Sequence, residues 1–218
     1  MHQHYARQST KNLGWVVKKT AYAAEQDRPD VAQRRKEWKN KQGTFQTSRL
    51  VFLDESGVNT GMTRLYGRAA KDKRVREAVP DTRFHRTTIL SSVRLDGATI
   101  PFVFEGALNG DIFRVYIQQL LAPSLKPGDI VIMDNLSSHK VSGIREAIES
   151  VGASILFLPP YSPDLNPIEL MWSKMKAILR KLRIRSKELL DDAIALAFDT
   201  VSISDISGWF RHDGYALL

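Results

Sequence analysis

The 218-residue sequence contains no cysteine. This absence excludes disulfide bonds and zinc sites built from thiolates. Any bound metal must therefore be held by carboxylate, carbonyl or histidine ligands, a set that favours hard cations such as Mg²⁺ or Mn²⁺.

Long apolar runs are also missing. No stretch approaches the roughly 18 consecutive apolar residues that a membrane-spanning helix requires, and the start of the chain, Met1 to His4, lacks the apolar core of a signal peptide. No glycine-rich phosphate loop follows a strand-like segment, because Leu108-Asn109-Gly110 has only the character of a turn. We therefore expect a cytoplasmic protein with no membrane partner, and a small-molecule α/β enzyme is the least favoured class.

Positive charge is present in excess, with a formal net charge of +8. Such a charge attracts polyanions and is compatible with either nucleic acid or an anionic membrane surface. The basic residues form two tracts around a less charged middle: Arg34, Arg35, Lys36, Lys39 and Lys41, then Lys174, Lys176, Arg180, Lys181, Arg183, Arg185 and Lys187. Each tract alone is equally compatible with the solvated face of a helix.

The size and the hydrophobic content of 43% suit one main domain with a small appendage. Residues 1–42 are predicted to be a connector, which includes a basic helix from Pro29 or Asp30 to about Asn40 that stops at Gly43. Residues 43–218 are predicted to form the main domain.

Hydrophobic periodicity predicts five strands, at residues 49–53, 87–95, 99–104, 129–134 and 154–158. The dipeptide Asp96-Gly97 favours a tight hairpin between the second and the third. A helix is expected to open at Asn109 and to end at Pro123. Its apolar face is predicted to consist of Ile112, Val115, Tyr116 and Leu120.

Three further helices are predicted: one marked by apolar positions from Ile144 to Val151, one starting at Asn166-Pro167, and a last one from about Ser186 to Val201. The resulting order is β-β-β-α-β-α-β-α-α. It predicts a mixed α/β fold with a five-stranded sheet, three antiparallel strands first and parallel crossovers afterwards. This is the order of an RNase H-like fold.

Two of the predicted strands end in a carboxylate, Asp54 and Asp134. The carboxyl ends of neighbouring strands meet at one edge of a sheet, where ligand sites lie. Either residue alone is explained more simply as a turn residue that accepts backbone hydrogen bonds. Together they form a costly pair of like charges, and a bound cation removes that cost.

Glu169 is a third candidate, in the first turn of the helix that follows Asn166-Pro167. The pattern matches a capping box, in which Asn166 is the N-cap and Glu169 reaches back to it. The same position also directs a carboxylate toward the edge of the sheet. The two roles compete for one side chain.

Three carboxylates at one edge can hold two divalent ions, Mg²⁺ or Mn²⁺, at a separation of roughly 3.5–4 Å. Such a pair cleaves phosphodiesters, because one ion activates a water molecule and the other stabilises the leaving alkoxide. We assign the bridging position to Asp54, and Asp134 and Glu169 would each secure one ion.

A longer signature supports this interpretation. Asp134-Asn135 with His139, followed by residues 160–169 and Trp172, resembles the DDE transposases of the insertion sequence 630 and mariner superfamily. The 34 residues between Asp134 and Glu169 are typical of that superfamily, and Asp54-Glu55-Ser56 resembles its first acidic motif. The resemblance spans roughly residues 25–215. It implies that Asp54, Asp134 and Glu169 are the metal-binding catalytic triad.

The resemblance also implies a reaction and its partners. Family members nick double-stranded DNA at the ends of their own element and then use the freed 3′-hydroxyl to attack target DNA. It implies a homodimer when active and a bacterial, nucleoid-associated location. Full-length members carry paired helix-turn-helix modules, of which residues 1–42 resemble only the last part and the linker. We therefore expect a separate helix-turn-helix partner or a fusion, although a degenerate copy of an element fits equally well.

Asn135 and His139 match the family pattern and are expected beside the metal ligands or in contact with substrate. For His139, a helix-start residue with a satisfied ring is an equal alternative. Trp172 recurs at helical spacing with apolar residues and is expected in the core. The DNA contacts are predicted on the helix that begins with Glu169, at Lys174, Lys176, Arg180 and Lys181.

Two alternatives remain open. The same three acids would serve an RNase H-like nuclease without strand transfer. From a different class, the chain could be a catalytically silent DNA-binding or regulatory fragment that acts through its basic tracts. The presence of all three acids argues against the silent fragment.

Overall fold

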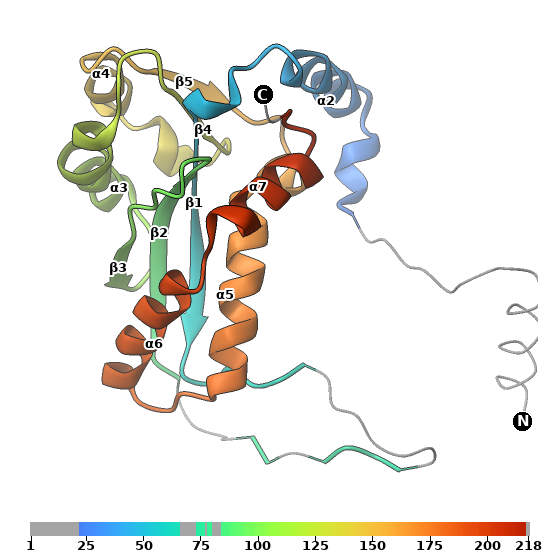
Figure 1. The fold of residues 1–218 in the computed structure, drawn as a ribbon, viewed down its shortest axis with the longest axis vertical. Helices are drawn as coiled ribbons and strands as arrows, with labels where there is room; N and C mark the ends of the chain where they lie inside the picture. Colours follow the sequence, from blue (N-terminus) through green and yellow to red (C-terminus); the bar gives the residue numbers. More distant parts are fainter. Residues whose placement is uncertain (1–21, 66–72, 77, 80–83, 217–218) are drawn as a thin grey trace, which may run out of the picture.

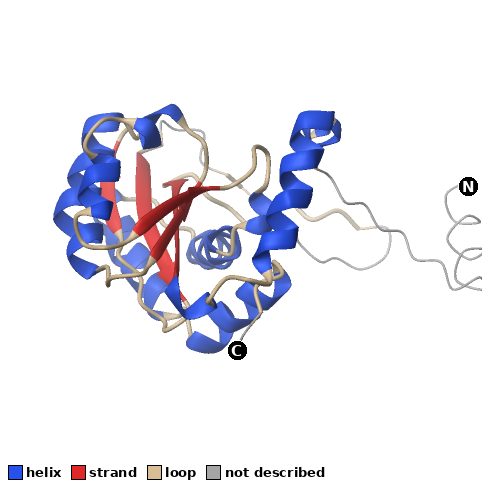
Figure 2. Cartoon of the chain, turned by 90° about the horizontal axis from the view of Figure 1, so that it is seen from above, coloured by secondary structure: helices blue, strands red, loops and turns tan. Residues whose placement is uncertain are grey.

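The computed structural model describes residues 22–65, 73–76, 78–79 and 84–216. Within them the chain forms a five-stranded sheet in the order β3-β2-β1-β4-β5, and helices cover both of its faces (Figures 1 and 2). None of the helices in this part of the chain is long and apolar enough to cross a bilayer.

The sheet has the predicted mixed topology. β1 (Leu50–Asn59), β2 (Arg86–Arg94) and β3 (Phe102–Glu105) form an antiparallel meander. β4 (Ile130–Met133) and β5 (Ser154–Phe157) then continue the sheet in parallel on the other side of β1. Three antiparallel strands followed by parallel crossovers were expected, and this arrangement is confirmed.

The predicted end of the first strand at Asp54 is wrong. β1 continues to Asn59, and Asp54 lies in its middle, opposite Ser91 of β2. The segment after Asp54 has turn-like residues, but β2 offers a hydrogen-bonding partner along the whole length, and pairing overrides the local preference. The hairpin at Asp96-Gly97 is confirmed, because Gly97 has a positive φ of 95° and Arg94 accepts from Gly97 N at 3.1 Å.

Side chains of β1 alternate between two cores. Leu50 and Phe52 pack into one core cluster, whereas Val51 and Leu53 pack into the other. The same alternation places Asp54 on the face of Phe52 and Glu55 on the opposite face. The two acids of the Asp54-Glu55 pair are therefore separated by the sheet itself.

The face of Val51 and Leu53 is covered by α3 (Gly110–Tyr116), which continues through a π-helical turn (Ile117–Leu121), and by α4 (Ile144–Glu149). The predicted apolar face of α3 is wrong in part, since Val115 and Leu120 are 41% and 37% exposed. The buried positions are Phe113, Tyr116, Ile117 and Leu121. The predicted and the observed apolar positions overlap at Tyr116. A π-helical turn has one more residue than an α-helical turn, and this brings Leu121, rather than Leu120, onto the sheet.

The face of Phe52 is covered by α5 (Ile168–Leu182), α6 (Lys187–Asp199), α7 (Ile203–His212) and one end of α2 (Pro29–Gln42). The sequence predicts no helix after Val201, so α7 is a correction. It is short, begins at a capping box between Ser202 and Asp205, and buries only Ile206 and Phe210. So few apolar positions give a weak periodic signal.

α2 begins and ends close to the predicted residues, and its partners lie near the end of the chain. Trp38 Nε1 donates to the Tyr215 hydroxyl at 3.1 Å, and Gln42 Nε2 donates to the Asp213 carbonyl at 2.8 Å. The proposed connector at residues 1–42 thus has one helix that packs on the sheet-bearing core. The part of that prediction concerning residues 1–21 lies outside the described residues.

Candidate active site

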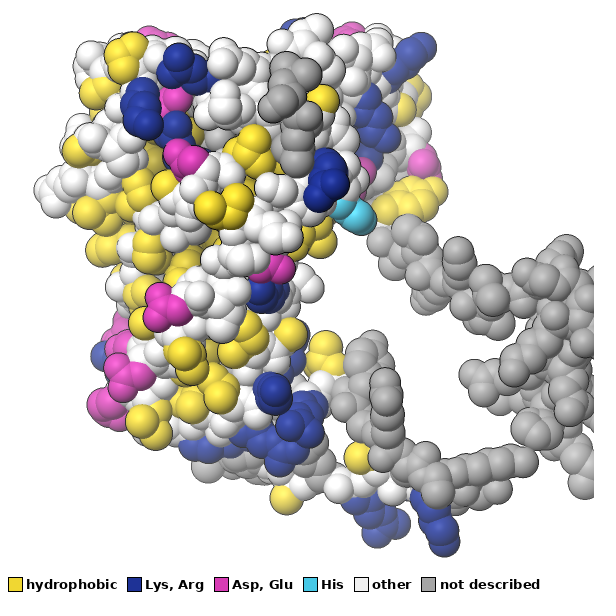
Figure 3. Space-filling view, in the orientation of Figure 1, with side chains coloured by type: hydrophobic (Ala, Val, Ile, Leu, Met, Phe, Trp, Pro, Cys, Tyr) yellow, Lys and Arg dark blue, Asp and Glu magenta, His cyan; other side chains and the backbone are white. Residues whose placement is uncertain are grey.

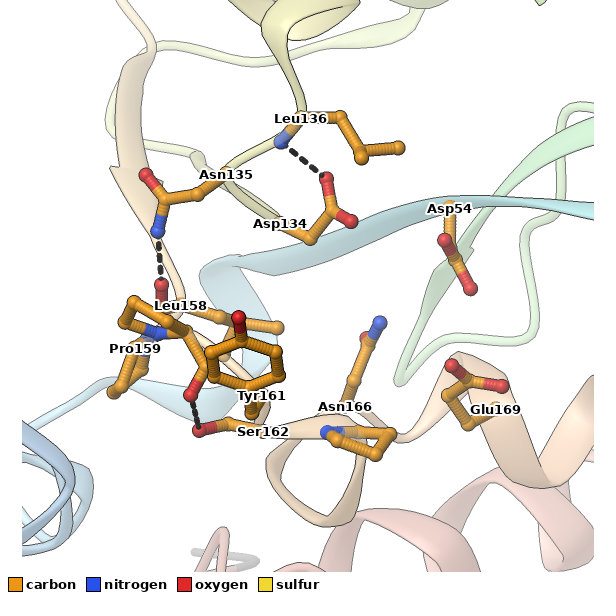
Figure 4. A pocket seen from close by; sticks show the side chains of 12 residues that line it. Asp54, Asp134, Asn135, Leu136, Leu158, Pro159, Tyr161, Ser162, Asn166 and Glu169 are labelled. Carbon is orange, nitrogen blue, oxygen red and sulfur yellow. Dashed lines mark hydrogen bonds between the residues drawn. The ribbon is translucent and has the colours of Figure 1, made fainter. Parts of the chain in front are cut away.

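Asp54, Asp134 and Glu169 line a single pocket of about 550 Å³ (Figure 4). They come from the middle of β1, the residue after β4 and the first turn of α5. Asn135, Leu158, Asn166 and the loop at residues 159–163 complete its walls. Residues separated by more than a hundred positions are therefore brought to one cavity, as the sequence predicted.

Asp54 is the most deeply enclosed of the three acids. Its position on the α5 face of β1 brings it to Trp172, whose indole Nε1 donates to Asp54 Oδ2 at 3.0 Å. Burial, together with the negative charges of Glu169 and Glu55, raises the pKa of Asp54 well above its ordinary value. A cation in the pocket would stabilise the ionised form of Asp54 and lower its pKa again.

The pKa of Asp134 is shifted in the opposite direction to that of Asp54. Its Oδ1 accepts from the backbone N–H of Leu136 at 3.0 Å and lies 2.7 Å from Nδ1 of His139. Burial alone would raise the pKa of Asp134, but the His139 and Leu136 contacts outweigh it and hold the pKa below its ordinary value. Asp134 is thus kept ionised and fixed in one orientation.

Glu169 does not serve as a cap, so the predicted capping box is wrong. The backbone N–H of Glu169 donates to the backbone carbonyl of Asn166 at 3.0 Å, and the helix has no side-chain cap. Pro167, rather than Asn166, occupies the capping position, which leaves the Glu169 carboxylate free to face the pocket. Burial raises the pKa of Glu169, Lys176 opposes this shift, and Asp134 adds to it.

His139 lies between two carboxylates. Its ring is buried and stacks on Phe113 with centroids 4.3 Å apart; Nδ1 faces Asp134, and Nε2 lies 3.5 Å from Glu55 Oε2. Burial by itself lowers the pKa of His139, but the contacts with Asp134 and Glu55 dominate and raise it to about 9. Of the two alternatives for His139, the structure favours a residue that holds an acid of the site over a mere helix-start residue.

Glu55 is the residue that the sequence argument did not select. The Asp54-Glu55 pair suggests it, but strand alternation points it away from Asp54, toward the His139 side of the sheet. Asn135 also has a supporting position, since its Nδ2 donates to the Leu158 carbonyl at 2.5 Å and ties the ends of β4 and β5 together.

The donors at the pocket suit a hard divalent cation. They are carboxylate oxygens, and Asn166, which lines the same pocket, has a buried amide oxygen with no hydrogen-bond partner among the described residues. Among the described residues, no three His, Asp or Glu side chains lie close enough to enclose one ion directly. The acids face the pocket from separate walls, as expected for mutually repelling charges.

The four predicted DNA-binding residues fall on different faces of α5. Lys176 and Arg180 follow Glu169 by seven and eleven positions and therefore share its face of the helix. Lys174 lies on another face of α5 and binds neighbouring parts of the chain. Its Nζ donates to the Thr200 carbonyl and to Asp205, both at 2.6 Å. Lys181 is exposed in the last turn. Figure 3 shows basic side chains gathered over this end of α5.

The comparisons with known proteins agree with this geometry. The family model described as DDE superfamily endonuclease matches residues 49–191. Among curated protein sequences, none matches the chain significantly.

Similar solved structures include three of Mos1. A Mos1 transposase paired-end complex with the left transposon end has a TM-score of 0.73 at 17% identity, over 96% of this chain and 66% of that one. A mariner Mos1 paired-end complex with Mg has a TM-score of 0.75 at 16% identity, over 97% and 68%. The catalytic domain of Mos1 mariner transposase has a TM-score of 0.56 at 15% identity, over 94% and 100%.

This chain thus spans about two thirds of the transposase chains in those complexes and the whole of the isolated catalytic domain. At such low identities the likeness establishes the fold, which is RNase H-like as the strand order predicted. The family model covers well over half of the chain and includes Asp54, Asp134 and Glu169. The chain therefore belongs to the DDE superfamily of endonucleases.

Proposed function

We propose that this chain is the catalytic domain of a DNA transposase, in which Asp54, Asp134 and Glu169 hold two divalent ions, Mg²⁺ or Mn²⁺. The observation that carries the proposal is the gathering of these three acids around one pocket in a DDE endonuclease fold. One of the similar structures is a Mos1 complex with a transposon end, and another contains Mg. Double-stranded DNA is accordingly the proposed substrate.

Two bound ions would supply Lewis acidity on both sides of the scissile phosphorus, activating the attacking hydroxyl and stabilising the leaving oxygen. The residues of the chain prepare the site for this chemistry. Trp172 fixes Asp54 by a buried N–H donor, and His139 with the Leu136 N–H fixes Asp134. Fixed ligands need no reorganisation during the reaction, which is how preorganised sites lower barriers.

The same site would serve cleavage at the element ends and joining to target DNA, because both reactions are displacements at phosphorus. Water is the nucleophile in the first and a DNA 3′-hydroxyl in the second. Lys176 and Arg180 are the proposed phosphate contacts, since they extend from the Glu169 face of α5, with exposed Lys181 nearby. Phosphate contacts of this kind give affinity without sequence specificity.

We also propose two protein partners. A second copy of the chain would allow two DNA ends to be processed together, in keeping with the paired-end complexes among the similar structures. A helix-turn-helix partner or fusion would recognise the end sequence. In this proposal residues 1–42 are the connector and residues 43–218 the catalytic domain, with α2 held on the core by Trp38 and Gln42.

The test is nicking of a supercoiled plasmid in Mg²⁺ or Mn²⁺, with EDTA as the blank. Wild type is compared with Asp134→Asn, Glu169→Gln and the control Glu149→Gln, a similar exchange at an exposed residue of α4 that lies outside the pocket and pairs with Arg145. We expect nicking by wild type and the control, and its loss in the two site variants. Equal nicking by all four proteins would contradict the proposal.

Two further outcomes separate the two alternatives: a nuclease that uses the same acids, and a silent fragment that binds DNA through its basic tracts. A labelled oligonucleotide with a free 3′-hydroxyl is incubated with the plasmid, and covalently joined products are sought. Nicking without joining would favour a nuclease that lacks strand transfer. DNA binding without metal-dependent nicking, in wild type and variants alike, would favour a silent DNA-binding fragment.

A further inference from the structure

Tyr161 has an unusual backbone conformation in the wall of the pocket. Its φ is 54°, in the left-handed region that bulky side chains rarely adopt. Among the described residues the only other non-glycine residue with a positive φ is Arg183, which ends α5 at an ordinary C-cap position. Tyr161 instead lies in the loop between β5 and α5, where no helix end explains it.

The ring of Tyr161 is not needed by the core. It is 46% exposed, whereas Ser162, Leu165 and Asn166 of the same loop are at most 6% exposed. The side chain lines the pocket across from Asp54 and Glu169 (Figure 4). No hydrogen bond joins its hydroxyl to another described residue, so folding leaves both the ring face and the phenol available.

Contacts from the N-terminal part of the chain hold this loop in place. Gln26 Nε2 donates to the Tyr161 carbonyl at 2.6 Å. Arg35 of α2 donates to Ser162 Oγ at 2.7 Å and to both oxygens of Asp164 at 2.9 and 2.6 Å. Strained residues persist only where the surroundings fix them, and they concentrate at functional sites. The presented ring is therefore a fixed feature of the pocket.

We propose that Tyr161 is a stacking platform for an unpaired nucleobase next to the scissile phosphate, an inference that rests on the proposed function. Divalent ions held by the acids would bind the phosphate, while Tyr161 with Leu158 and Pro159 gives the opposite wall an apolar, aromatic surface. A base inside a duplex is stacked on both sides and cannot contact a protein ring, so the base would have to leave the stack. Aromatic stacking accepts any base and adds affinity without sequence readout.

A fluorescent DNA tests this inference. The probe is a short duplex with a two-nucleotide unpaired 3′ tail, whose first unpaired base is 2-aminopurine, a base quenched by aromatic stacking. Binding is measured by anisotropy with Ca²⁺ in place of Mg²⁺, to suppress cleavage. We expect quenching by wild type and by Tyr161→Phe, which keeps the ring.

Tyr161→Ala and Tyr161→Gly should lose the quench and bind the tailed probe between about fivefold and 150-fold more weakly. Glycine accepts a positive φ freely, so Tyr161→Gly should melt at or above the temperature of wild type, which separates the DNA effect from misfolding. Tyr22→Ala removes an exposed tyrosine outside the pocket, whose hydroxyl contacts Asp27, and should behave as wild type.

The outcomes distinguish this inference from the proposed function. Wild-type quenching and affinity in both Tyr161→Ala and Tyr161→Gly would overturn the stacking role alone. Quenching by an Asp134→Asn variant that no longer nicks would support it independently of cleavage. If wild type binds no DNA at all, the proposed function fails and the stacking role with it.

Discussion

The two basic helices, α2 and α5, have similar charge in sequence but different positions in the fold. α5 buries Ile168, Met171, Trp172, Met175 and Leu179 along one stripe, and it carries Glu169 into the pocket. α2 buries only Val31, Trp38 and Gln42, and one of its cations, Arg35, is used to hold the loop at residues 162–164. Two tracts of similar charge thus have different positions: on α2, Arg35 acts as a structural clamp, whereas on α5 a DNA surface is proposed.

A matched pair of tryptophans gives the largest expected contrast. Trp172 of α5 and Trp38 of α2 belong to one core cluster, and each donates its indole N–H, to Asp54 and to the Tyr215 hydroxyl respectively. Replacement of either by alanine should destabilise the fold by about 3–5 kcal/mol. Phenylalanine keeps most of the volume and removes the donor, at a cost of about 1–3 kcal/mol.

Only Trp172→Phe should also abolish most metal-dependent nicking, because its lost partner is a proposed metal ligand. The measurements are thermal melting and plasmid nicking at a temperature where both variants are folded. Equal nicking by Trp172→Phe and Trp38→Phe would show that the bond to Asp54 does not matter for the reaction.

The next contrast concerns DNA affinity. Lys176→Ala with Arg180→Ala removes two positive charges from the Glu169 face of α5, and Lys36→Ala with Lys39→Ala removes two from exposed α2. Long-range attraction falls equally in both double variants. If α5 contacts phosphates directly, only its variant should reduce the slope of log affinity against log salt, by about 0.9 for each lost contact. Identical slopes would remove α5 from the proposed interface.

Much of this arrangement was predictable, and the exceptions have physical causes. Strand order and the three acids were found because apolar runs and a long motif are local patterns. The position of Asp54 within β1 was missed because the length of β1 depends on its pairing with β2, where Ser91 lies opposite Asp54. The bond from Trp172 to Asp54 was missed because helical spacing identifies a core residue but not where its polar atom points. α7 was missed because it buries only two apolar residues.

The supporting residues of the site were predictable only in part. His139 was selected from the motif, but its link to Glu55 depends on the alternation of β1 and on the packing of Phe113. The sequence around Asn166 and Glu169 has the pattern of a capping box, but in the fold the Glu169 carboxylate faces the pocket instead. Where a side chain could play either of two local roles, tertiary contacts decide its orientation, and a single sequence does not reveal those contacts.

Arg35 gives a smaller effect and tests the clamp assigned to α2. Arg35→Ala should destabilise the fold by about 1–2 kcal/mol, since Asp164 is half exposed and solvent screens part of the ion pair. Arg35→Lys keeps the charge but not the two-pronged geometry, and it should recover only part of the loss. In the 2-aminopurine assay, Arg35→Ala should weaken quenching because the Tyr161 loop is no longer fixed. Full quenching with lowered stability would limit Arg35 to a structural role.

The smallest expected effect concerns the other end of the α2 contact, where Gln42 meets Asp213. Burial raises the pKa of Asp213 to about 6 from an ordinary 3.8, and His212 offsets only part of this shift. The folded protein therefore binds the Asp213 proton more tightly than the unfolded chain, and this group's contribution to stability falls as the pH rises from about 4 to about 6.

Asp213→Asn removes the buried charge and should raise the melting temperature by about 2–4 °C at pH 7.5, with little change at pH 4. Asp192→Asn, on an exposed part of α6, is the control. An equal shift at both pH values would mean that the gain comes from packing and not from the carboxylate.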